Sequence, residues 1–416
     1  MAEFRAPPGT HDVLPPESAR WKRLVGLFSR AATRAGYGLV VSPMFEDVGV
    51  FERVGEGTDV VRKEMYEFED KGGRRVALRP EGTASIVRAY TQHRPTTPFK
   101  AWYVAPSFRY ERPQAGRYRQ HHQLGVEALG SDDPDLDVEV VALAWSIVGQ
   151  LGLRQVTLLL NSLGDTVCRP GYIDTLRSFL DSHLDELCDE HNNTAADNPL
   201  RVLDCKRDSC RAATADAPRL VDHLCEACRA HFERLQEGLT TLAVPFRIEP
   251  RLVRGLDYYT RTTFELQAEA LESAQNGVGG GGRYDALAEA LGGPPTPGIG
   301  FGLGVERLLL ACDGEGVFGT PDRAVDVWVI DTTGGRAALM LSHELRTHGI
   351  CTDRSFDGRS MKAQFKSADR SGARVAVIVG EREAAEGKVT VRDLASGEQR
   401  LLARDALVGE LWEMLS

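Results

Sequence analysis

Charged and amide side chains recur at regular spacing in residues 103–128, where they could build a binding site for a small charged ligand. Two alternating runs separated by turn residues predict a β-hairpin, at residues 103–111, 112–116 and 118–128. Because alternate residues of a strand share a face, Arg109, Gln123 and Glu127 are expected to form a polar floor, with Gly125 as a gap at its centre. The alternative is an ordinary hairpin whose charged face is exposed to solvent.

A second stretch of ligand-binding character is residues 251–264, RLVRGLDYYTRTTF. Arg254 precedes a glycine, so its side chain lies beside backbone with unusual freedom. Tyr258 and Tyr259 fall on opposite faces if the chain is extended, so that one ring can pack while the other contacts a ligand. A core strand edged by arginine would have the same pattern, and both interpretations remain open.

Two glycine-rich stretches follow. Residues 279–282 are four consecutive glycines, and their entropic cost favours a close approach of backbone to a ligand, or a strained bend, over a plain surface loop. Glycines at alternate positions of residues 298–304 clear one face of a strand and leave a flat ledge for a ring. Arg307 lies at the start of the next helix, where the helix dipole also favours an anion. No G-x-x-x-x-G-K-[ST] motif occurs, so arginines are expected to hold any phosphate.

The composition is that of an ordinary globular protein. With 416 residues the chain is too long for one compact core, so two or three domains are expected. A net charge of −10 argues against a protein that coats nucleic acid non-specifically, although a local basic face is compatible with it. There is no signal-peptide core and no apolar run of about 18 residues. A cytoplasmic protein without membrane association is therefore expected, and its 8 cysteines are expected to be thiols or ligands.

The elements that must position these residues follow from hydrophobic periodicity. In the first part of the chain it predicts helices at residues 17–35 and 137–151, a strand at 39–41, and a hairpin of 65–68 with 75–78. Short helical segments and most of the cysteines indicate an inserted helical subdomain at about 165–245. After a break at 313–323, strands are predicted at 325–330, 350–352, 374–379 and 389–393, and helices at 336–348, 361–371 and 403–415. This alternation predicts an α/β domain with a largely parallel sheet at 325–416, which leaves 1–320 as the first domain.

Six potential metal ligands gather in the insertion, at Cys188, His191, Cys205, Cys210, Cys225 and Cys228. Pairs spaced two residues apart are typical of structural zinc, but their order and the long gaps match no standard finger, and buried free cysteines are the alternative. In the C-terminal domain four basic residues share one side of a helix, at Arg359, Lys362, Lys366 and Arg370. That side suits a nucleic-acid backbone, or is simply a solvated helix face.

Taken together, these stretches resemble a known family. Residues 36–45, 108–127 and 300–307 resemble motifs 1, 2 and 3 of the class II aminoacyl-tRNA synthetases, and ALRPEGTA (77–84), LVRGLDYYT (252–260) and GGGRYD (280–285) resemble hallmarks of the histidyl-tRNA synthetase family. The resemblance covers nearly the whole chain and is loosest in the insertion. It implies an α+β catalytic domain built on a six-stranded antiparallel sheet, a helical insertion, and a C-terminal α/β domain that binds the anticodon.

The activity that the resemblance implies is that of a histidine–tRNA ligase. Such an enzyme makes histidyl-adenylate and pyrophosphate from L-histidine and ATP with Mg²⁺, transfers histidine to the 3′ end of its tRNA, and acts as a homodimer joined through motif 1. The alternative is a non-catalytic, histidine-sensing regulatory subunit; such relatives generally lack the anticodon domain and the LVRGLDYYT stretch, both of which occur here. A synthetase for another amino acid is disfavoured by residues 252–260 and by Glu127.

The resemblance also implies roles for individual residues. Arg109 and Arg254 are expected to be catalytic and to contact the α-phosphate from its two sides. The residues expected to bind the rest of ATP are Arg117, Gly302, Gly304 and Arg307, the two arginines at the outer phosphates. The histidine amino group is expected to contact Glu81, Thr83 and Gln123. Its imidazole ring is expected to contact Glu127 and Tyr259, with Tyr258 and Tyr284 beside it.

Overall fold

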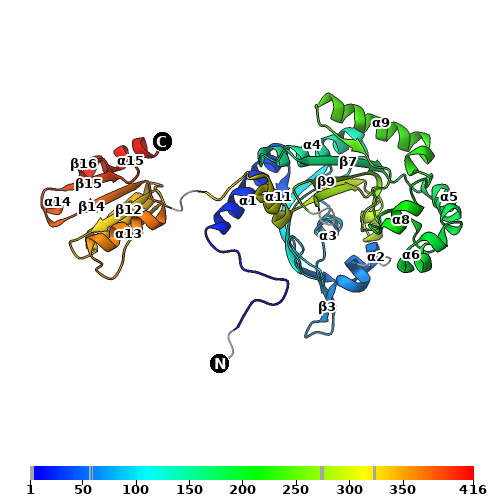
Figure 1. Ribbon diagram of the computed structural model, residues 1–416, viewed down its shortest axis with the longest axis horizontal. Coiled ribbons are helices and arrows are strands. Elements are labelled where there is room, and N and C mark those ends of the chain that lie inside the picture. Colours follow the sequence, from blue (N-terminus) through cyan, green and yellow to red (C-terminus); the bar gives the residue numbers. More distant parts are fainter. Residues whose placement is uncertain (1–3, 56–57, 59, 272–275, 322–324) are drawn as a thin grey trace. The chain divides into compact units, whose positions relative to one another are not determined.

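The computed structural model describes residues 4–55, 58, 60–271, 276–321 and 325–416. Trp21–Gly319 form the body of one compact unit, and Thr320–Ser416 form the body of another (Figure 1). Each unit has hydrophobic clusters of its own. Within the described residues, no helix is both long and apolar enough to cross a membrane.

An eight-stranded sheet forms the centre of the first unit. Its order is β1 (Gly38–Leu39), β5 (Phe99–Phe108), β6 (Gln120–Leu129), β11 (Gly298–Gly304), β10 (Gly277–Arg283), β9 (Thr260–Ala268), β7 (Val156–Ser162) and β8 (Arg247–Ile248). The six inner strands pair antiparallel, which confirms the predicted catalytic sheet. A two-residue strand is added in parallel at each edge.

Three helices cover one face of this sheet: α1 (Glu17–Arg34), α4 (Pro134–Gln150) and α11 (Val305–Glu315) (Figure 1). They form one core with the even-numbered residues of β6 from Leu124 to Ala128. Because side chains alternate along a strand, Gln123, Gly125 and Glu127 lie on the opposite face, as the sequence predicts. The site is built on that opposite face, next to α3 (Thr83–His93).

Smaller elements flank the site. A three-stranded sheet has the order β2 (Phe45–Asp47), β4 (Arg75–Leu78) and β3 (Tyr66–Glu69). Strands β3 and β4 are the predicted hairpin, and its turn contains Gly73 at a φ of 74°. The short helical segments nearby are α2 (Gly49–Gly55), a π-helical turn at Val60–Glu64, and α10 (Leu287–Ala290).

The predicted helical insertion lies between β7 and β8. Its helices are α5 (Arg169–Asp181), α6 (Asp189–Thr194), α7 (Pro199–Leu203), α8 (Asp208–Ala213) and α9 (Glu226–Thr241), with 3₁₀ turns at Leu184–Glu186 and Leu220–His223. Among these helices only α5 and α9, with 13 and 16 residues, exceed two turns. The middle of the insertion is therefore made of pieces too short to be stable alone.

The second unit contains a five-stranded sheet of order β13 (Thr352–Arg354), β12 (Val327–Asp331), β14 (Val375–Val379), β15 (Lys388–Asp393) and β16 (Gln399–Ala403). Its helices are α12 (Arg336–Thr347), α13 (Met361–Ser371), α14 (Glu381–Ala385) and α15 (Leu407–Leu415). Only β13, β12 and β14 pair in parallel, so the prediction of a largely parallel sheet holds for one half of it. The helix predicted from residue 403 begins later because residues 399–403 pair with β15 instead.

Candidate active site

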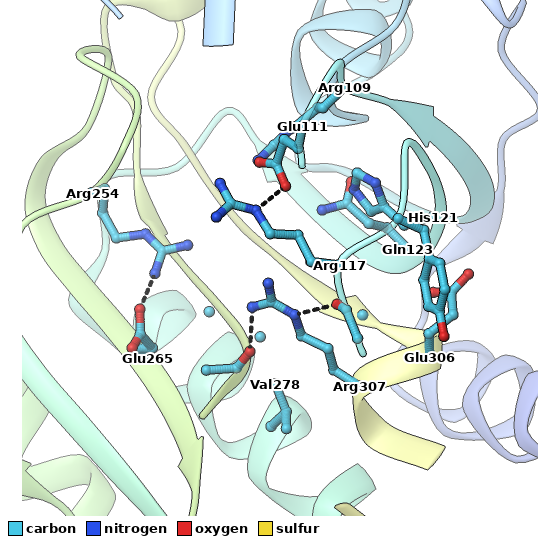
Figure 2. A pocket seen from close by; sticks show the side chains of 17 residues that line it. Arg109, Glu111, Arg117, His121, Gln123, Arg254, Glu265, Val278, Glu306 and Arg307 are labelled. Carbon is cyan, nitrogen blue, oxygen red and sulfur yellow. Dashed lines mark hydrogen bonds and ion pairs between the residues drawn. The ribbon is translucent and has the colours of Figure 1, made fainter. Parts of the chain in front are cut away.

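A cavity of about 220 Å³ opens on the polar face of the central sheet. Its lining comes from β6, β9, β10 and β11, from the turn between β5 and β6, from the segment before β9, and from the start of α11. Figure 2 shows the side chains of Arg117 and Arg307 close to one another and Arg254 on the wall opposite them. Arg109 lines the same cavity. The structure therefore gathers all four arginines that the sequence assigned to phosphate around one hollow.

Two of these arginines are held by backbone carbonyl groups. Arg307 donates from Nε to the carbonyl oxygen of Gly116 and from Nη1 to that of Gly277, both at 2.9 Å (Figure 2). Arg109 donates from Nε to the carbonyl oxygen of Pro80 at 2.9 Å. A carbonyl partner directs a guanidinium without neutralising it, so both side chains present positive charge to the cavity.

The other two arginines are paired with carboxylates. Arg254 Nη1 lies 3.1 Å from Oε2 of Glu265, and Arg117 pairs with Glu111. The Nε of Arg254 is buried and has no hydrogen-bond partner among the described residues. A buried donor without a partner is uncommon in folded proteins, and Arg254 is also one of the residues that line the cavity.

His121 also lines the cavity, and the sequence analysis did not single it out. Burial lowers its pKa to about 3, and the guanidinium groups of Arg109 and Arg307 contribute in the same direction. The ring is therefore neutral at physiological pH and can accept a hydrogen bond. The alternation that placed Gln123 on the polar face also places His121 there, so the sequence contained this signal.

The glycine-rich strands have two different explanations. A Cβ built on Gly281 would lie 1.9 Å from the carbonyl oxygen of Gly300, and one on Gly282 would lie 2.4 Å from that of Thr262. These two glycines are required by the neighbouring strands, not by a ligand. A Cβ on Gly302 or Gly304 would meet nothing closer than 3.3 Å, which agrees with the predicted open ledge beneath the cavity.

Glu127 is fully buried beside this cavity. Its carboxyl group accepts hydrogen bonds from the hydroxyls of Thr83 (2.7 Å), Tyr103 (3.2 Å) and Tyr284 (2.5 Å). Burial raises the pKa of Glu127 to about 8, against the opposing effect of these hydroxyl donors. The close approach also explains Gly300, because a Cβ there would lie 1.9 Å from Oε2 of Glu127.

Tyr103 is a second residue of this site that the sequence analysis missed. Its ring lies over Gly125, where an added Cβ would be 2.1 Å from Cζ, and against Gly82, where the corresponding distance to Cζ is 2.5 Å. The gap expected at the centre of the polar floor is therefore filled by this ring and does not hold a ligand. Tyr103 pairs with Gly125 across β5 and β6, and this cross-strand register could not be known before the turn was placed.

The remaining predicted contacts of histidine surround Glu127. Glu81 accepts from the backbone N–H groups of Thr83 (2.6 Å) and Ala84 (2.8 Å) at the start of α3, and burial raises the pKa of its carboxyl group. Tyr258 donates to Oε2 of Glu81 at 3.5 Å, and the rings of Tyr258 and Tyr259 lie 4.6 Å apart. These side chains are therefore connected to Glu127 by hydrogen bonds and form one polar group, called the slot below.

Gln123 lines the arginine-lined cavity, and it lies on the same face of β6 as Glu127. Its Oε1 accepts from the hydroxyl of Ser107 at 3.1 Å. A carbonyl oxygen has two lone pairs, so one acceptor site of this amide is left for a ligand.

The cysteine candidates do not form a single cluster. The structure divides them into two groups of four ligands, Cys188, His191, Cys205 and Cys210 in one and Asp165, Cys168, Cys225 and Cys228 in the other. Asp165 and Cys168 were not among the predicted ligands, although their spacing of three repeats that of Cys225 and Cys228.

Comparisons with known proteins agree with this geometry. The family model for histidyl-tRNA synthetase matches residues 9–308, and the model for an anticodon binding domain matches residues 326–414. The histidine–tRNA ligase of Halothermothrix orenii is 46% identical, and the match covers 99% of this chain and 100% of that protein. The histidine–tRNA ligase of Rhodococcus erythropolis is 50% identical over 99% of this chain and 98% of that protein.

A solved structure has the same fold. The crystal structure of the histidyl-tRNA synthetase of S. aureus, determined without ligands, has a TM-score of 0.82 at 35% identity and covers 98% of this chain and 100% of that chain. The likeness thus spans the catalytic sheet, the insertion and the C-terminal unit together. The chain therefore belongs to the histidyl-tRNA synthetase family, a family of aminoacyl-tRNA ligases.

Proposed function

We propose that the chain attaches L-histidine to its tRNA in two steps within the arginine-lined cavity and the adjoining slot. In the first step a carboxylate oxygen of histidine bonds to the α-phosphorus of ATP, and pyrophosphate leaves with the electron pair of the broken P–O bond. In the second step a hydroxyl of the 3′-terminal adenosine attacks the histidyl carbonyl carbon, and AMP leaves. The observation that carries this proposal is that four arginines surround one cavity next to a buried carboxyl group.

The proposed binding of ATP rests on charge and shape. Arg109 and Arg254 contact the α-phosphate, and Arg117 and Arg307 contact the outer phosphates. The carbonyl partners of Arg109 and Arg307 support this assignment, because these guanidinium groups are already directed before the substrate arrives. Preorganised charge of this kind stabilises the transition state without a covalent nucleophile.

The ledge at Gly302 and Gly304 is proposed to carry the adenosine. Neither glycine presents a side chain to the cavity, so the floor of the site is backbone over which a planar ring can lie. Residues 302 and 304 also pair with Gly125 and Gln123 of β6. The base would therefore lie over the same two strands that hold the histidine slot, with the triphosphate directed towards the arginines.

The imidazole ring of histidine is proposed to bind between Glu127 and Tyr259, with Tyr258 and Tyr284 beside it. Three hydroxyls donate to the carboxyl group of Glu127, whose raised pKa keeps it largely protonated at neutral pH. Its own O–H is left to donate to a ring nitrogen. A different amino acid would leave buried polar groups unpaired, a penalty that reaches about 10⁴–10⁵ in discrimination in sites of this kind.

The amino group of histidine is proposed to lie between Glu81, Thr83 and Gln123. The carboxyl group of Glu81 supplies charge, and Thr83 and Gln123 supply oxygen acceptors. Each of these atoms has a partner that fixes its position, such as Ser107 for the oxygen of Gln123. Three acceptors match the three N–H donors of an ammonium group.

Magnesium prefers oxygen ligands, and the carboxylates of Glu111, Glu265 and Glu306 line the cavity. These residues fit a role in holding Mg²⁺ together with the phosphates of ATP. When bound, the ion supplies positive charge that offsets the charge on the departing pyrophosphate. Glu265 and Glu111 are each paired with an arginine, so binding of ATP and Mg²⁺ would replace those pairs.

At the level of the whole chain we propose a catalytic domain at 1–320, including the insertion, and an anticodon-binding domain at 325–416. Lys362, Lys366 and Arg370 are exposed on α13, and Arg359 is exposed just before the N-cap of that helix and not on the helix itself; exposure is what contact with a tRNA backbone requires. We also propose a cytoplasmic homodimer joined through residues 36–45. Apolar side chains are exposed there at Leu39, Val41, Met44 and Phe45.

A non-catalytic, histidine-sensing subunit is the second candidate. It would need the slot around Glu127 but not the phosphate arginines or a C-terminal anticodon-binding unit. Both of these features are present, and the relatives with 46% and 50% identity match over the whole length of the chain. The catalytic reading is therefore preferred.

The decisive experiment is amino-acid-dependent exchange of pyrophosphate into ATP, performed with each of the twenty amino acids. Exchange with histidine alone is expected, followed by charging of histidine acceptors when total tRNA is added. Exchange with none of the amino acids, together with measurable binding of histidine, would favour the regulatory subunit. Exchange with a different amino acid would contradict the assignment of the slot.

A further inference from the structure

The insertion contains two groups of metal-ligand side chains outside the active site. The α6–α8 site consists of Cys188, His191, Cys205 and Cys210, and the α5–α9 site consists of Asp165, Cys168, Cys225 and Cys228. In each group the four ligand atoms all lie within 4.8 Å of one another. Tetrahedral zinc with Zn–S bonds of about 2.3 Å separates its ligand atoms by roughly 3.8 Å, so each group needs only a small contraction around an ion.

We propose that the insertion binds two structural zinc ions, one at each of these sites, and that they hold its short helices to one another and to the catalytic domain. Each site combines two pairs of ligands, and the two members of a pair are close in the sequence, as in structural zinc sites. In the α6–α8 site the pairs are Cys188 with His191 and Cys205 with Cys210. In the α5–α9 site they are Asp165 with Cys168 and Cys225 with Cys228.

The α6–α8 site is already organised as a ligand set. Cys188 Sγ lies 3.2 Å from Nδ1 of His191, and Cys210 Sγ lies 3.9 Å from the same nitrogen. The backbone N–H of Cys188 donates to Cys210 Sγ at 3.2 Å. An N–H donor to a sulfur stabilises the thiolate that binds a metal, as expected for a neighbour that orients a ligand.

The α5–α9 site lies where the insertion joins the catalytic domain. Asp165 and Cys168 follow the end of β7, and Cys225 and Cys228 lie at the start of α9, through which the chain returns. Oδ1 of Asp165 is 3.5 Å from Cys168 Sγ and 3.9 Å from Cys225 Sγ. An ion here would therefore join the outgoing and returning segments of the insertion.

The charges around the α5–α9 site also suit a metal. Three thiolates and one carboxylate around Zn²⁺ carry a net charge of −2, because each thiol loses its proton to solvent on binding and the carboxylate is already ionised. Oδ2 of Asp165 lies 3.4 Å from Nη2 of Arg261 on β9. This contact leaves Oδ1 directed at the sulfurs and supplies one compensating positive charge.

Disulfide bonds explain these groups less well than zinc. All eight cysteines are free thiols, and each site contains three of them. A disulfide would use two thiols and leave the third thiol, together with His191 or Asp165, without a function. Thiolates with one imidazole or carboxylate form a ligand set that favours zinc over magnesium or calcium.

The test is the zinc content of the purified full-length chain, expressed with zinc in the medium and then dialysed. Two zinc ions per chain are expected by elemental analysis. Cys205→Ser and Cys225→Ser should each retain one, and the double variant none. Cys351→Ser, a change at an exposed cysteine outside both sites, is the matched control and should retain two.

A second measurement on the unsubstituted chain does not depend on whether the variants fold. Unfolding in guanidinium with a colorimetric zinc indicator should release two equivalents, and all eight cysteines should then react as thiols. Replacement of zinc by Co²⁺ should produce the thiolate-to-cobalt absorption of tetrahedral sites. The proposal is overturned if the chain contains no zinc after this preparation or if it contains disulfides. If Cys205→Ser has the same zinc content as the unsubstituted chain, the α6–α8 site is overturned. If Cys225→Ser has the same zinc content as the unsubstituted chain, the α5–α9 site is overturned.

Discussion

The guanidinium group of Arg254 has one nitrogen in an ion pair and another without a hydrogen-bond acceptor. Its Nη1 is paired with Glu265, whereas its Nε is buried without a partner among the described residues. If it donates to the α-phosphate in the transition state, Arg254→Ala should lower histidine-dependent pyrophosphate exchange by about 10²–10³. Circular dichroism should show that the fold survives.

Arg247→Ala is the matched control for this change. Arg247 lies on the edge strand β8 and makes an ion pair of 3.6 Å with Glu249, in which the arginine is largely exposed. Its substitution should leave exchange near the wild-type rate. If Arg254→Ala also exchanges at a near-normal rate, the arginine has no part in the reaction.

The raised pKa of Glu127 predicts how the free energy of unfolding depends on pH. Its pKa rises from 4.5 in the unfolded chain to about 8 in the fold, mainly because of burial. Between these values the folded state binds an extra proton, so this group's contribution to the free energy of unfolding falls as pH rises from about 4.5 to about 8. Glu127→Gln removes the titration, and its stability relative to the wild type should increase between about pH 5.5 and about pH 8.5.

Thermal unfolding midpoints at the two pH values measure this effect. The exposed Glu289 on α10 offers a control, because Glu289→Gln should shift relative to the wild type by the same amount at both pH values. An unchanged difference between wild type and Glu127→Gln across the range would show that Glu127 titrates as an ordinary carboxyl group in the fold.

At the scale of elements, α4 is held to the sheet by a buried ion pair. Arg283 of β10 and Asp137 of α4 are both fully buried and bonded to each other. Asp137 also accepts from His231 of α9 at 2.8 Å and from Thr262 of β9 at 2.6 Å. Burial opposes ionisation of Asp137, but the hydrogen bonds from His231 and Arg283 keep its pKa below the usual value.

Arg283→Ala should therefore destabilise the first unit by about 3–5 kcal/mol, because it leaves an uncompensated carboxylate in the core. The control is Arg234→Ala on α9, which removes an exposed pair at 2.9 Å with Asp135 of α4 and should cost far less, because exposed ion pairs contribute little to stability. Urea unfolding of both variants measures the difference. An equal loss of unfolding free energy in the two variants would mean that Arg283 does not hold α4 to the sheet.

At the scale of the whole molecule, the exposed apolar residues around β1 carry the proposed self-association. Val41 is 85% exposed and Leu39 is 57% exposed. Val41→Asp should shift the chain from dimer towards monomer in sedimentation velocity, because a charge would be buried without a partner at the interface. Leu242→Asp introduces a charge at another exposed apolar residue, at the C-cap of α9, and should remain dimeric. A monomeric wild-type chain, or a Val41→Asp dimer of undiminished strength, would contradict this interface.

Features with short-range causes were predictable from the sequence. The helix predicted at 361–371 is α13 to the residue, and the hairpin predicted at 65–78 is β3 and β4. Alternation along residues 120–129 also placed Gln123 and Glu127 on the polar face. In these segments local periodicity and turn residues agree with the fold, so no distant contact was needed to decide them.

Features that depend on residues far apart in the chain were decided only by the tertiary structure. Three such features are Tyr103 over Gly125, the requirement for Gly281 beside Gly300, and the meeting of Asp165 and Cys168 with Cys225 and Cys228. They result from strand register and from the path of the insertion. The sequence by itself determined which arginines and glycines have the type and local spacing suited to a phosphate, and the resemblance of its motifs to a known family suggested the contacts with an imidazole ring. Which of them meet was decided by the packing of the whole chain, since burial and long-range pairing act on the folded chain and leave no local pattern.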